Sequence, residues 1–330
     1  MKVSICIPTY RQVEYLRETL QSVLTQDFQD FEVIITDDSP DDSVHDLLSE
    51  FSFGDRLRYV RNSPALGSPE NWNAAIRLVQ GEYVKIMHHD DQFFRPDALR
   101  LFVQMLDQNP DADFAFCGTM VKHIDVDMQR VHCATNRQLA DLAGDPASLF
   151  VGNCIGAPSS TICRRSASLD YDPQMKWLVD IDYYYRMLMS NPKFAYTTEV
   201  LISTPTNAKH QVTELCRDNA VIELGEAMLL FEKFSSEQRE NPLVKKGWEI
   251  LFQRFRIRKI EDFSRYGLPV PQDDSAKDGY FTALLKQPYT IWHLLMDPKL
   301  LASKIYYRLC LYVLGPIRQR LKRLLKKSVI

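Results

Sequence analysis

Short apolar segments alternate with amphipathic segments along the first 120 residues of the chain. Residues 3–7, 31–35 and 83–87 are apolar runs rich in β-branched side chains, a pattern typical of buried strands. Similar runs predict strands over 57–60 and 114–117. Between the strands, apolar residues at helical spacing predict helices over 16–24, 43–51, 71–79 and 97–108, with Gly81 ending the third of these. The alternation predicts an α/β fold in which helices flank a mostly parallel sheet.

The rest of the chain is less regular. Residues 118–211 mix strand-like segments with an apolar helix over 183–189, residues 212–265 have a helical pattern, and 267–274 have the composition of a linker. We therefore expect an α/β domain over 1–212, built from halves at 1–120 and 121–212. A helical extension over 213–265, a linker with short helices over 266–297 and a tail over 298–330 should follow.

The tail is basic and amphipathic. No acidic residue follows Asp297, whereas nine lysines and arginines do. Apolar residues recur at helical spacing among them, at Ile317, Leu321, Leu324 and Leu325. Such a helix is expected to lie on an anionic membrane surface, which would place the protein on the inner face of the cell membrane. The alternative is a basic helix packed against its own domain or a partner.

Composition and charge narrow the class of protein only slightly. Hydrophobic residues make up 45% of the chain and charged residues 25%, which is ordinary for a globular protein. The formal net charge of −3 argues neither for nor against nucleic acid, and no nucleic-acid partner is expected. Seven cysteines without a C-x-x-C pair resemble neither a disulfide framework nor a zinc site. The N-terminus does not resemble a signal peptide, and no run approaches the roughly 18 to 20 apolar residues of a membrane span. The expected location is cytoplasmic.

Polar clusters follow three of the predicted strands. In parallel sheets, ligands bind outside the carboxyl ends of the strands, so these clusters should converge. The first glycine is Gly54, which leaves the turn after the first strand without a dinucleotide fingerprint or a Walker loop. A diphosphate bound there would need a divalent cation held by carboxylates instead. The clusters are Pro8-Thr9-Tyr10, Asp37-Asp38 and His88-His89-Asp90-Asp91.

Five motifs in succession resemble glycosyltransferase family 2. They are residues 3–10, residues 33–39, Gly67 with 71–75, residues 81–84 leading to Asp90-Asp91, and residues 177–182 with Arg186. They extend the resemblance over about residues 1–212. It implies a GT-A fold and transfer of a sugar, with inversion, from a nucleotide-diphosphate donor, with a UDP-sugar expected.

The resemblance also implies which residues would hold the nucleotide. Pro8, Thr9 and Tyr10 would line the base, Asp37 would accept a hydrogen bond from the base edge, and Asp38 would support the ribose or a loop. Asp37 and Asp38 could instead belong to a simple turn, since turns favour such residues. Asn71 and Asn73 would face the nucleotide, or Asn71 would cap the helix that it opens. His88 and His89 would lie beside the donor.

The metal motif departs from the family pattern. The family has D-x-D-D at this point, and His88 replaces the first aspartate. Asp90 fits the position of the carboxylate that coordinates Mn²⁺ or Mg²⁺. His88 would hydrogen-bond the ribose or the donor, or would be a structural histidine at the end of a strand. His210 resembles a histidine that binds the metal or the diphosphate, or it is structural.

Asp180 is the expected catalytic base. It stands at the family's base position when counted back from Arg186, and Val179 occupies the place of the neighbouring acid. Without that like charge, there is less reason for the pKa of Asp180 to rise. The alternative is that Asp180 merely caps a helix. Residues expected at the acceptor are Asp91, Asn153, Trp177 and Asp182.

The sequence thus predicts a metal-dependent, inverting glycosyltransferase that acts on a saccharide or lipid-linked acceptor in polysaccharide or surface-glycan synthesis. A sugar-phosphate nucleotidyltransferase is an alternative, but residues 11–14 do not form the glycine-rich, basic loop that this class needs after the first strand. A catalytically inactive nucleotide-sugar-binding protein is a third interpretation. The His88 replacement favours it, whereas retention of Asp38, Asp90 and Asp180 opposes it.

Overall fold

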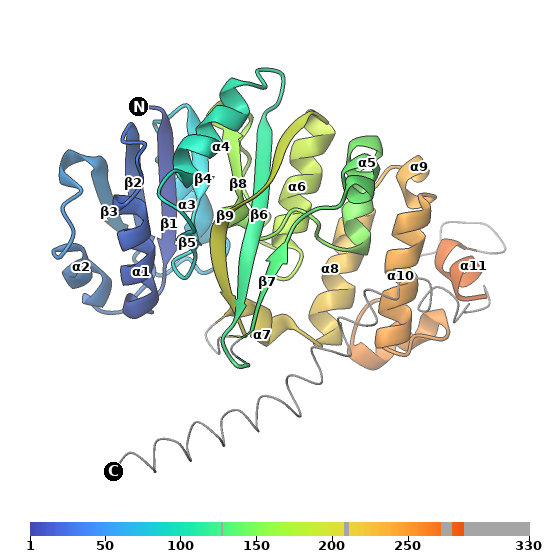
Figure 1. Cartoon of the computed structure of the whole chain (residues 1–330). Helices are drawn as coiled ribbons and strands as arrows, with labels where there is room; N and C mark the ends of the chain where they lie inside the picture. The colour runs from blue at the N-terminus through green and yellow to red at the C-terminus, as the bar shows by residue number, and fades with distance from the viewer. Residues whose placement is uncertain (127, 208–210, 272–278, 287–330) are drawn as a thin grey trace, which may run out of the picture.

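A single mixed sheet of nine strands organises the molecule (Figure 1). The computed structural model describes residues 1–126, 128–207, 211–271 and 279–286. The strand order is β3-β2-β1-β4-β8-β6-β9-β5, and β7 pairs with β6. The strands are β1 Val3–Thr9, β2 Phe31–Asp37, β3 Leu57–Arg61, β4 Tyr83–Ile86, β5 Gln92–Phe93, β6 Phe114–His123, β7 Met128–His132, β8 Thr161–Arg164 and β9 Phe194–Thr206.

The N-terminal half of the sheet is parallel, as predicted. β3, β2, β1 and β4 pair in parallel, so their carboxyl ends share one edge. The β8 strand then enters antiparallel between β4 and β6, while β9 returns parallel to β6. The sheet as a whole is therefore mixed, because a strand from the second half of the domain separates the two parallel segments.

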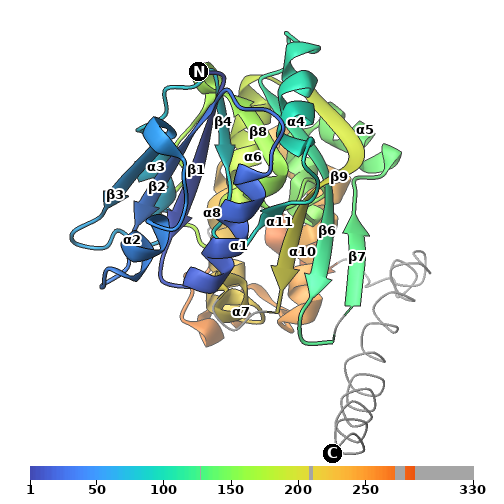
Figure 2. The ribbon, with the colours of Figure 1, turned by 60° about the vertical axis from the view of Figure 1, so that its left-hand side comes forward.

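Helices cover both faces of the sheet. Successive strand residues point to opposite faces. Val3, Ile5 and Ile7 of β1 pack in one apolar cluster with α1, α2 and α4, whereas Cys6 packs in the other with α3, α6 and the helical extension. Figure 2 shows α1 and α4 in front of the sheet and α6 and α8 behind it. These helices are α1 Val13–Leu24, α2 Ser43–Leu48, α3 Glu70–Ile76, α4 Ala98–Asp107, α5 Asn136–Gly144 and α6 Val179–Ser190.

The helical extension packs behind α6 (Figure 1). Trp248 and Phe252 of α10 are almost fully buried, beside Leu224 and Leu230 of α8. No helix among the described residues is long and apolar enough to cross a membrane. The basic tail over 298–330 lies outside the described residues. The elements of the extension are α7 Val212–Cys216, α8 Ala220–Glu232, α9 Ser236–Arg239, α10 Pro242–Arg254, the 3₁₀ helix η5 Ile260–Tyr266, and α11 Tyr280–Lys286.

Several element bounds differ from the sequence prediction. The helix expected over 43–51 ends at Leu48, and the one expected over 183–189 spans Val179–Ser190. The helix expected over 71–79 ends at Ile76, and Gly81 does not terminate it. A Cβ at Gly81 would lie 2.7 Å from the backbone nitrogen of Ser4, so this glycine lets the chain approach β1 closely. The strand expected over 114–117 continues to His123, because β9 supplies a long parallel partner.

Candidate active site

The carboxyl ends of β1 and β4 open on a cavity of about 1080 Å³. One wall comes from the turn after β1 and from α3, and the floor from the residues after β4. The opposite wall comes from the loop 150–158, the N-terminus of α6, and residues of α8 and α10. The cavity brings together most of the residues that the sequence singles out. Those in its lining are Pro8, Thr9, Tyr10, Asp38, Asn71, His88, His89, Asp90, Asp91, Asn153, Trp177 and Asp180.

Asp38 supports the loop that borders the nucleotide side of the cavity. Its carboxylate accepts hydrogen bonds from the Asn62 side chain at 2.8 Å, the Leu66 backbone at 3.0 Å and the Gly67 backbone at 2.7 Å. Gly67 has a φ of +75°, a conformation that favours glycine. Of the two roles expected for Asp38, the structure thus shows the loop contact.

Asn71 ties this wall to the first strand instead of capping its helix. Its amide donates to the Thr9 carbonyl at 3.0 Å and accepts from the Asn62 side chain at 2.9 Å. The helix begins at Glu70 without a side-chain cap. The interpretation of Asn71 as a cap is therefore wrong, because the end of β1 uses its amide group.

Asp37 and Asn73 lie outside the cavity lining, contrary to the expectation that both face the nucleotide. Asp37 is fully buried, and it accepts hydrogen bonds from the Ser39 backbone at 2.8 Å and the Tyr59 hydroxyl at 2.9 Å. Asn73 is also fully buried, and its amide pairs with the backbone of Tyr171 at 2.7 and 2.9 Å. Both side chains hold neighbouring segments together, which explains why polar residues occupy these buried positions.

His88 presents a neutral imidazole to the cavity. Burial lowers its pKa to about 4. Its ring packs against Trp72 with centroids 4.6 Å apart, and its Nε2 atom has no hydrogen-bond partner among the described residues. A buried nitrogen of this kind is suited to a bound ligand. No signal in the sequence indicated that Trp72 would pack against His88.

The carboxylate of Asp90 meets the end of β9. Gln211 donates to Asp90 at 2.9 Å and to the Pro205 carbonyl at the same distance. The sequence carries no signal for this contact across 121 positions. Asp90 is only 8% exposed.

Asp91 lies deeper than an acceptor-binding role would require. Its side chain is 2% exposed, and burial followed by the Asp90 charge raises its pKa. Lys85 lies behind it, fully buried, and burial lowers the pKa of that ammonium group to about 7. Lys85 donates to the Ser159 carbonyl and to the Ile86 carbonyl. Each charge lowers the free-energy cost of burying the other, because the negative carboxylate of Asp91 favours the positive ammonium group of Lys85.

Asp180 lies in the first turn of α6 and faces the cavity. Asn153 donates to its carboxylate at 2.7 Å, and the Ile181 backbone donates at 2.8 Å. Burial raises the pKa of Asp180 to about 6, although these hydrogen bonds oppose the rise. The expectation that this pKa has little reason to rise is therefore wrong, because burial acts without a neighbouring acid in the sequence.

Asp182 points away from the cavity. It is fully buried, and it forms ion pairs with Arg186 at 2.8 Å and with Lys233 at 2.6 Å. The expected contact with the acceptor is therefore wrong for this residue. Residues two apart in a helix point in different directions, so only Asp180 reaches the cavity.

Asn153 also has a different neighbour from the one expected. Its amide oxygen accepts from the backbones of Ile155 and Gly156, and its amide nitrogen donates to Asp180. Besides lining the cavity, it therefore holds Asp180 in place. His210, the second expected metal ligand, lies outside the described residues.

The described residues fit a divalent cation only if the phosphates of a bound substrate supply further ligands. No group of three His, Cys, Asp or Glu side chains able to hold a metal occurs among them. Asp90 faces the cavity, and the Gln211 amide donates to its carboxylate. Mg²⁺ is commonly held by one or two carboxylates together with substrate phosphates, so Asp90 fits that type of site.

The fold and the site define a GT-A type protein with a polar cavity at the carboxyl ends of its parallel strands. Residues 4–168 match the family Glycosyl transferase family 2. The chain belongs to glycosyl transferase family 2. The matched part ends before α6, so Asp180 and the helical extension lie beyond it.

Individual relatives share only parts of their length with this chain. An uncharacterized protein of Mycobacterium tuberculosis, MT1568, is 30% identical over 57% of this chain and 62% of its own length. The abequosyltransferase RfbV of Salmonella typhimurium is 34% identical over 34% of each chain. Both matches span less than two thirds of the relative.

A solved structure supports the fold over almost the whole chain. The mannosyltransferase PcManGT from Pyrobaculum calidifontis, solved with GDP-Man and Mn²⁺, superposes with a TM-score of 0.55 over 97% of this chain and 87% of that one. Sequence identity is 14%, so the likeness concerns the fold.

Proposed function

We propose that this protein transfers a sugar, with inversion, from a nucleotide-diphosphate donor, a UDP-sugar, to a hydroxyl of a saccharide or lipid-linked acceptor. The observation that carries the proposal is the shared cavity. It joins His88 and Asp90 after β4 to Asp180 at the start of α6. Direct attack of the acceptor hydroxyl on the donor sugar requires the donor site and the general base to face the same cavity. Membership in the family and the similarity to an abequosyltransferase support the same activity.

The base in the proposed reaction is Asp180. The acceptor oxygen forms a bond to the anomeric carbon, its proton moves to the Asp180 carboxylate, and the electron pair of the broken bond leaves with the nucleotide diphosphate. A pKa of about 6 keeps most of this carboxyl ionised at neutral pH while making it a stronger base than an ordinary aspartate.

Three other residues prepare the donor side. Asp90 would hold Mn²⁺ or Mg²⁺, which offsets the charge that develops on the leaving diphosphate. The neutral His88 would hydrogen-bond the donor through Nε2, where a carboxylate would add unfavourable negative charge to the site. Trp72 fixes the orientation of this imidazole.

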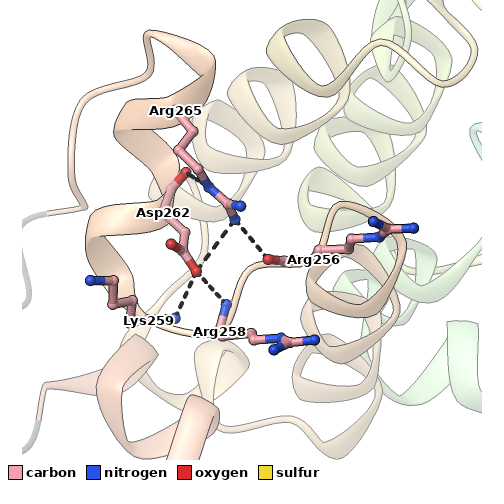
Figure 3. A pocket seen from close by; sticks show the side chains of 5 residues that line it. All are labelled: Arg256, Arg258, Lys259, Asp262 and Arg265. Atoms are coloured by element: carbon pink, nitrogen blue, oxygen red, sulfur yellow. Dashed lines mark hydrogen bonds and ion pairs between the residues drawn. The ribbon is translucent and has the colours of Figure 1, made fainter.

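We also propose that the protein lies on the inner face of the cell membrane, as part of polysaccharide or surface-glycan synthesis. The basic tail supports this. A cluster of exposed basic residues on the extension supports it too, formed by Arg256, Arg258, Lys259 and Arg265 around Asp262 (Figure 3). Figure 3 shows the side chains of Arg256 and Arg258 extending to one side and that of Lys259 to the other, so the three do not converge on a small anion and suit a charged surface better.

A direct test is slow release of nucleotide diphosphate from a panel of nucleotide sugars in the presence of Mn²⁺. Release of UDP from at least one UDP-sugar, accelerated by a saccharide or lipid-linked acceptor, is the expected result. Release of pyrophosphate from a nucleoside triphosphate and a sugar phosphate would point to a nucleotidyltransferase. Binding of a nucleotide sugar without any turnover would point to an inactive binding protein.

A further inference from the structure

A buried carboxylate on the helical extension holds the segment that precedes Asp180. Glu226 lies on α8 and is 6% exposed. Its two oxygens accept hydrogen bonds from three consecutive backbone N–H groups, those of Lys176 at 2.9 Å, Trp177 at 2.8 Å and Leu178 at 2.8 Å. Charge-assisted bonds of this type are about twice as strong as neutral ones. Glu226 therefore fixes three residues of backbone from a distance of 48 to 50 positions in sequence.

This contact anchors the backbone that leads into α6. The N-cap residue of α6 is Leu178, which has no side-chain cap bond. The N-terminus of a helix carries partial positive charge and unpaired N–H groups, and a carboxylate there is favourable. Glu226 supplies that carboxylate from a different helix. Because Asp180 lies in the first turn of α6, fixing this end of the helix also fixes the direction of the Asp180 side chain.

We propose that Glu226 is a positioning residue for the acceptor side of the site, acting through Trp177 and Asp180. This inference rests on the proposed transferase function. By this proposal the helical extension contributes to catalysis, because its residue Glu226 orients Asp180 of the α/β domain. Within the described part of the chain, the Glu226 carboxylate accepts from the backbone of residues 176–178 and not from the nucleotide side built by β1, α3 and the end of β4, so donor binding should not depend on it.

The test compares two isosteric changes on α8 in the full chain. Glu226→Gln keeps the shape but presents an amide NH₂ to a backbone N–H that needs an acceptor. Glu223→Gln is the matched control for the exchange measurement only, because Glu223 itself lines the cavity and its replacement also alters the site. Glu223 is 1% exposed on the same helix, and it pairs with Arg254 and with the Asp218 backbone, not with residues 176–178.

Two measurements are made, the first on both variants and the second on Glu226→Gln. Amide hydrogen exchange should become faster at 176–178 in Glu226→Gln by about tenfold or more, and stay near wild type there in Glu223→Gln. Steady-state transfer by Glu226→Gln should lose at least about tenfold in kcat while the KM for the donor changes little, because misplacing a base slows chemistry more than donor binding.

Several outcomes would overturn the proposal. Unchanged exchange at 176–178 in Glu226→Gln would show that Glu226 does not hold this segment. A wild-type kcat in a folded Glu226→Gln would show that the contact does not affect catalysis. Equally faster exchange at 176–178 in both variants would assign the effect to a loosened α8. If Glu226→Gln fails to fold, Glu226→Asp is measured in the same way, since its shorter side chain cannot reach all three amides. If the wild type shows no transfer, the proposed function fails, while the exchange measurement still decides whether Glu226 holds this segment.

Discussion

Asn153 and Asp180 form a 2.7 Å hydrogen bond between the loop after η2 (Pro146–Val151) and the first turn of α6. The amide of Asn153 is itself held by the backbones of Ile155 and Gly156, so it is a rigid donor. The bond favours the ionised form of Asp180 and opposes the effect of burial on its pKa. Asn153, which was expected to contact the acceptor, thus orients the proposed base Asp180.

Replacing Asn153 should change the pH dependence of transfer. In Asn153→Ala, Asp180 loses a donor to its ionised form, so its pKa should rise further and the acidic limb of kcat/KM should move to higher pH. We expect roughly tenfold lower kcat at neutral pH, from the raised pKa and from lost orientation. An unshifted acidic limb would show that Asn153 does not act through Asp180.

The pKa of Asp180 itself predicts two pH effects. Because the proposed base must be ionised, kcat/KM of the wild type should rise with pH through about 6. Folding raises this pKa above its ordinary value of 3.8, so the associated stabilisation is complete below about pH 4 and is lost as pH rises to about 6. The free energy of unfolding of the wild type, minus that of Asp180→Asn, should fall over this range by at most about 3 kcal/mol. Urea unfolding at several pH values measures it, and a difference independent of pH would contradict the raised pKa.

Asp180 and Asp182 should separate catalysis from stability. Asp180→Asn should abolish transfer, leave nucleotide and metal binding near wild type, and cost little stability. Asp182→Asn should retain appreciable activity but lose about 2 to 3 kcal/mol of stability, because Arg186 and Lys233 lose their fully buried partner. Transfer assays and urea unfolding of both variants measure the two effects. The reverse pattern would reassign the base to Asp182.

Nucleotide diphosphate should bind weakly unless a divalent cation is present. If Asp90 holds Mn²⁺ or Mg²⁺ bridged to the diphosphate, Asp90→Asn should lose the cation-dependent part of binding while its fold survives. Calorimetric titration of UDP with Mn²⁺ and with excess chelator measures this. Equal affinity in both conditions would favour a mechanism without a metal.

The basic tail should bind anionic membranes. Each basic residue near such a surface contributes roughly 1 kcal/mol, so the full chain should pellet with anionic liposomes and a chain truncated near residue 298 should pellet much less. Neutral liposomes are the control. Equal pelleting of the two chains would rule out the tail as the anchor and leave the exposed basic residues near η5 as the remaining candidates.

The order of strands and helices in the first 120 residues follows from sequence because local periodicity carries it. Apolar runs and helical spacings are set by which face each residue buries, so β1, β2, β4 and their helices could be predicted. The family motifs likewise located Asp90 and Asp180 at the cavity. Both signals lie within short stretches of chain.

Tertiary structure alone decided which side chain of Asp37-Asp38, and which of Asp180 and Asp182, faces the cavity. Asp37 and Asp38 are equivalent as sequence, yet Asp37 is enclosed by Ser39 and Tyr59 while Asp38 lines the cavity. Likewise, the ion pairs of Asp182 need Lys233 from 51 positions away, and the raised pKa of Asp180 comes from burial by distant segments. Burial and long-range hydrogen bonds depend on which segments meet in space, and local sequence does not contain that information.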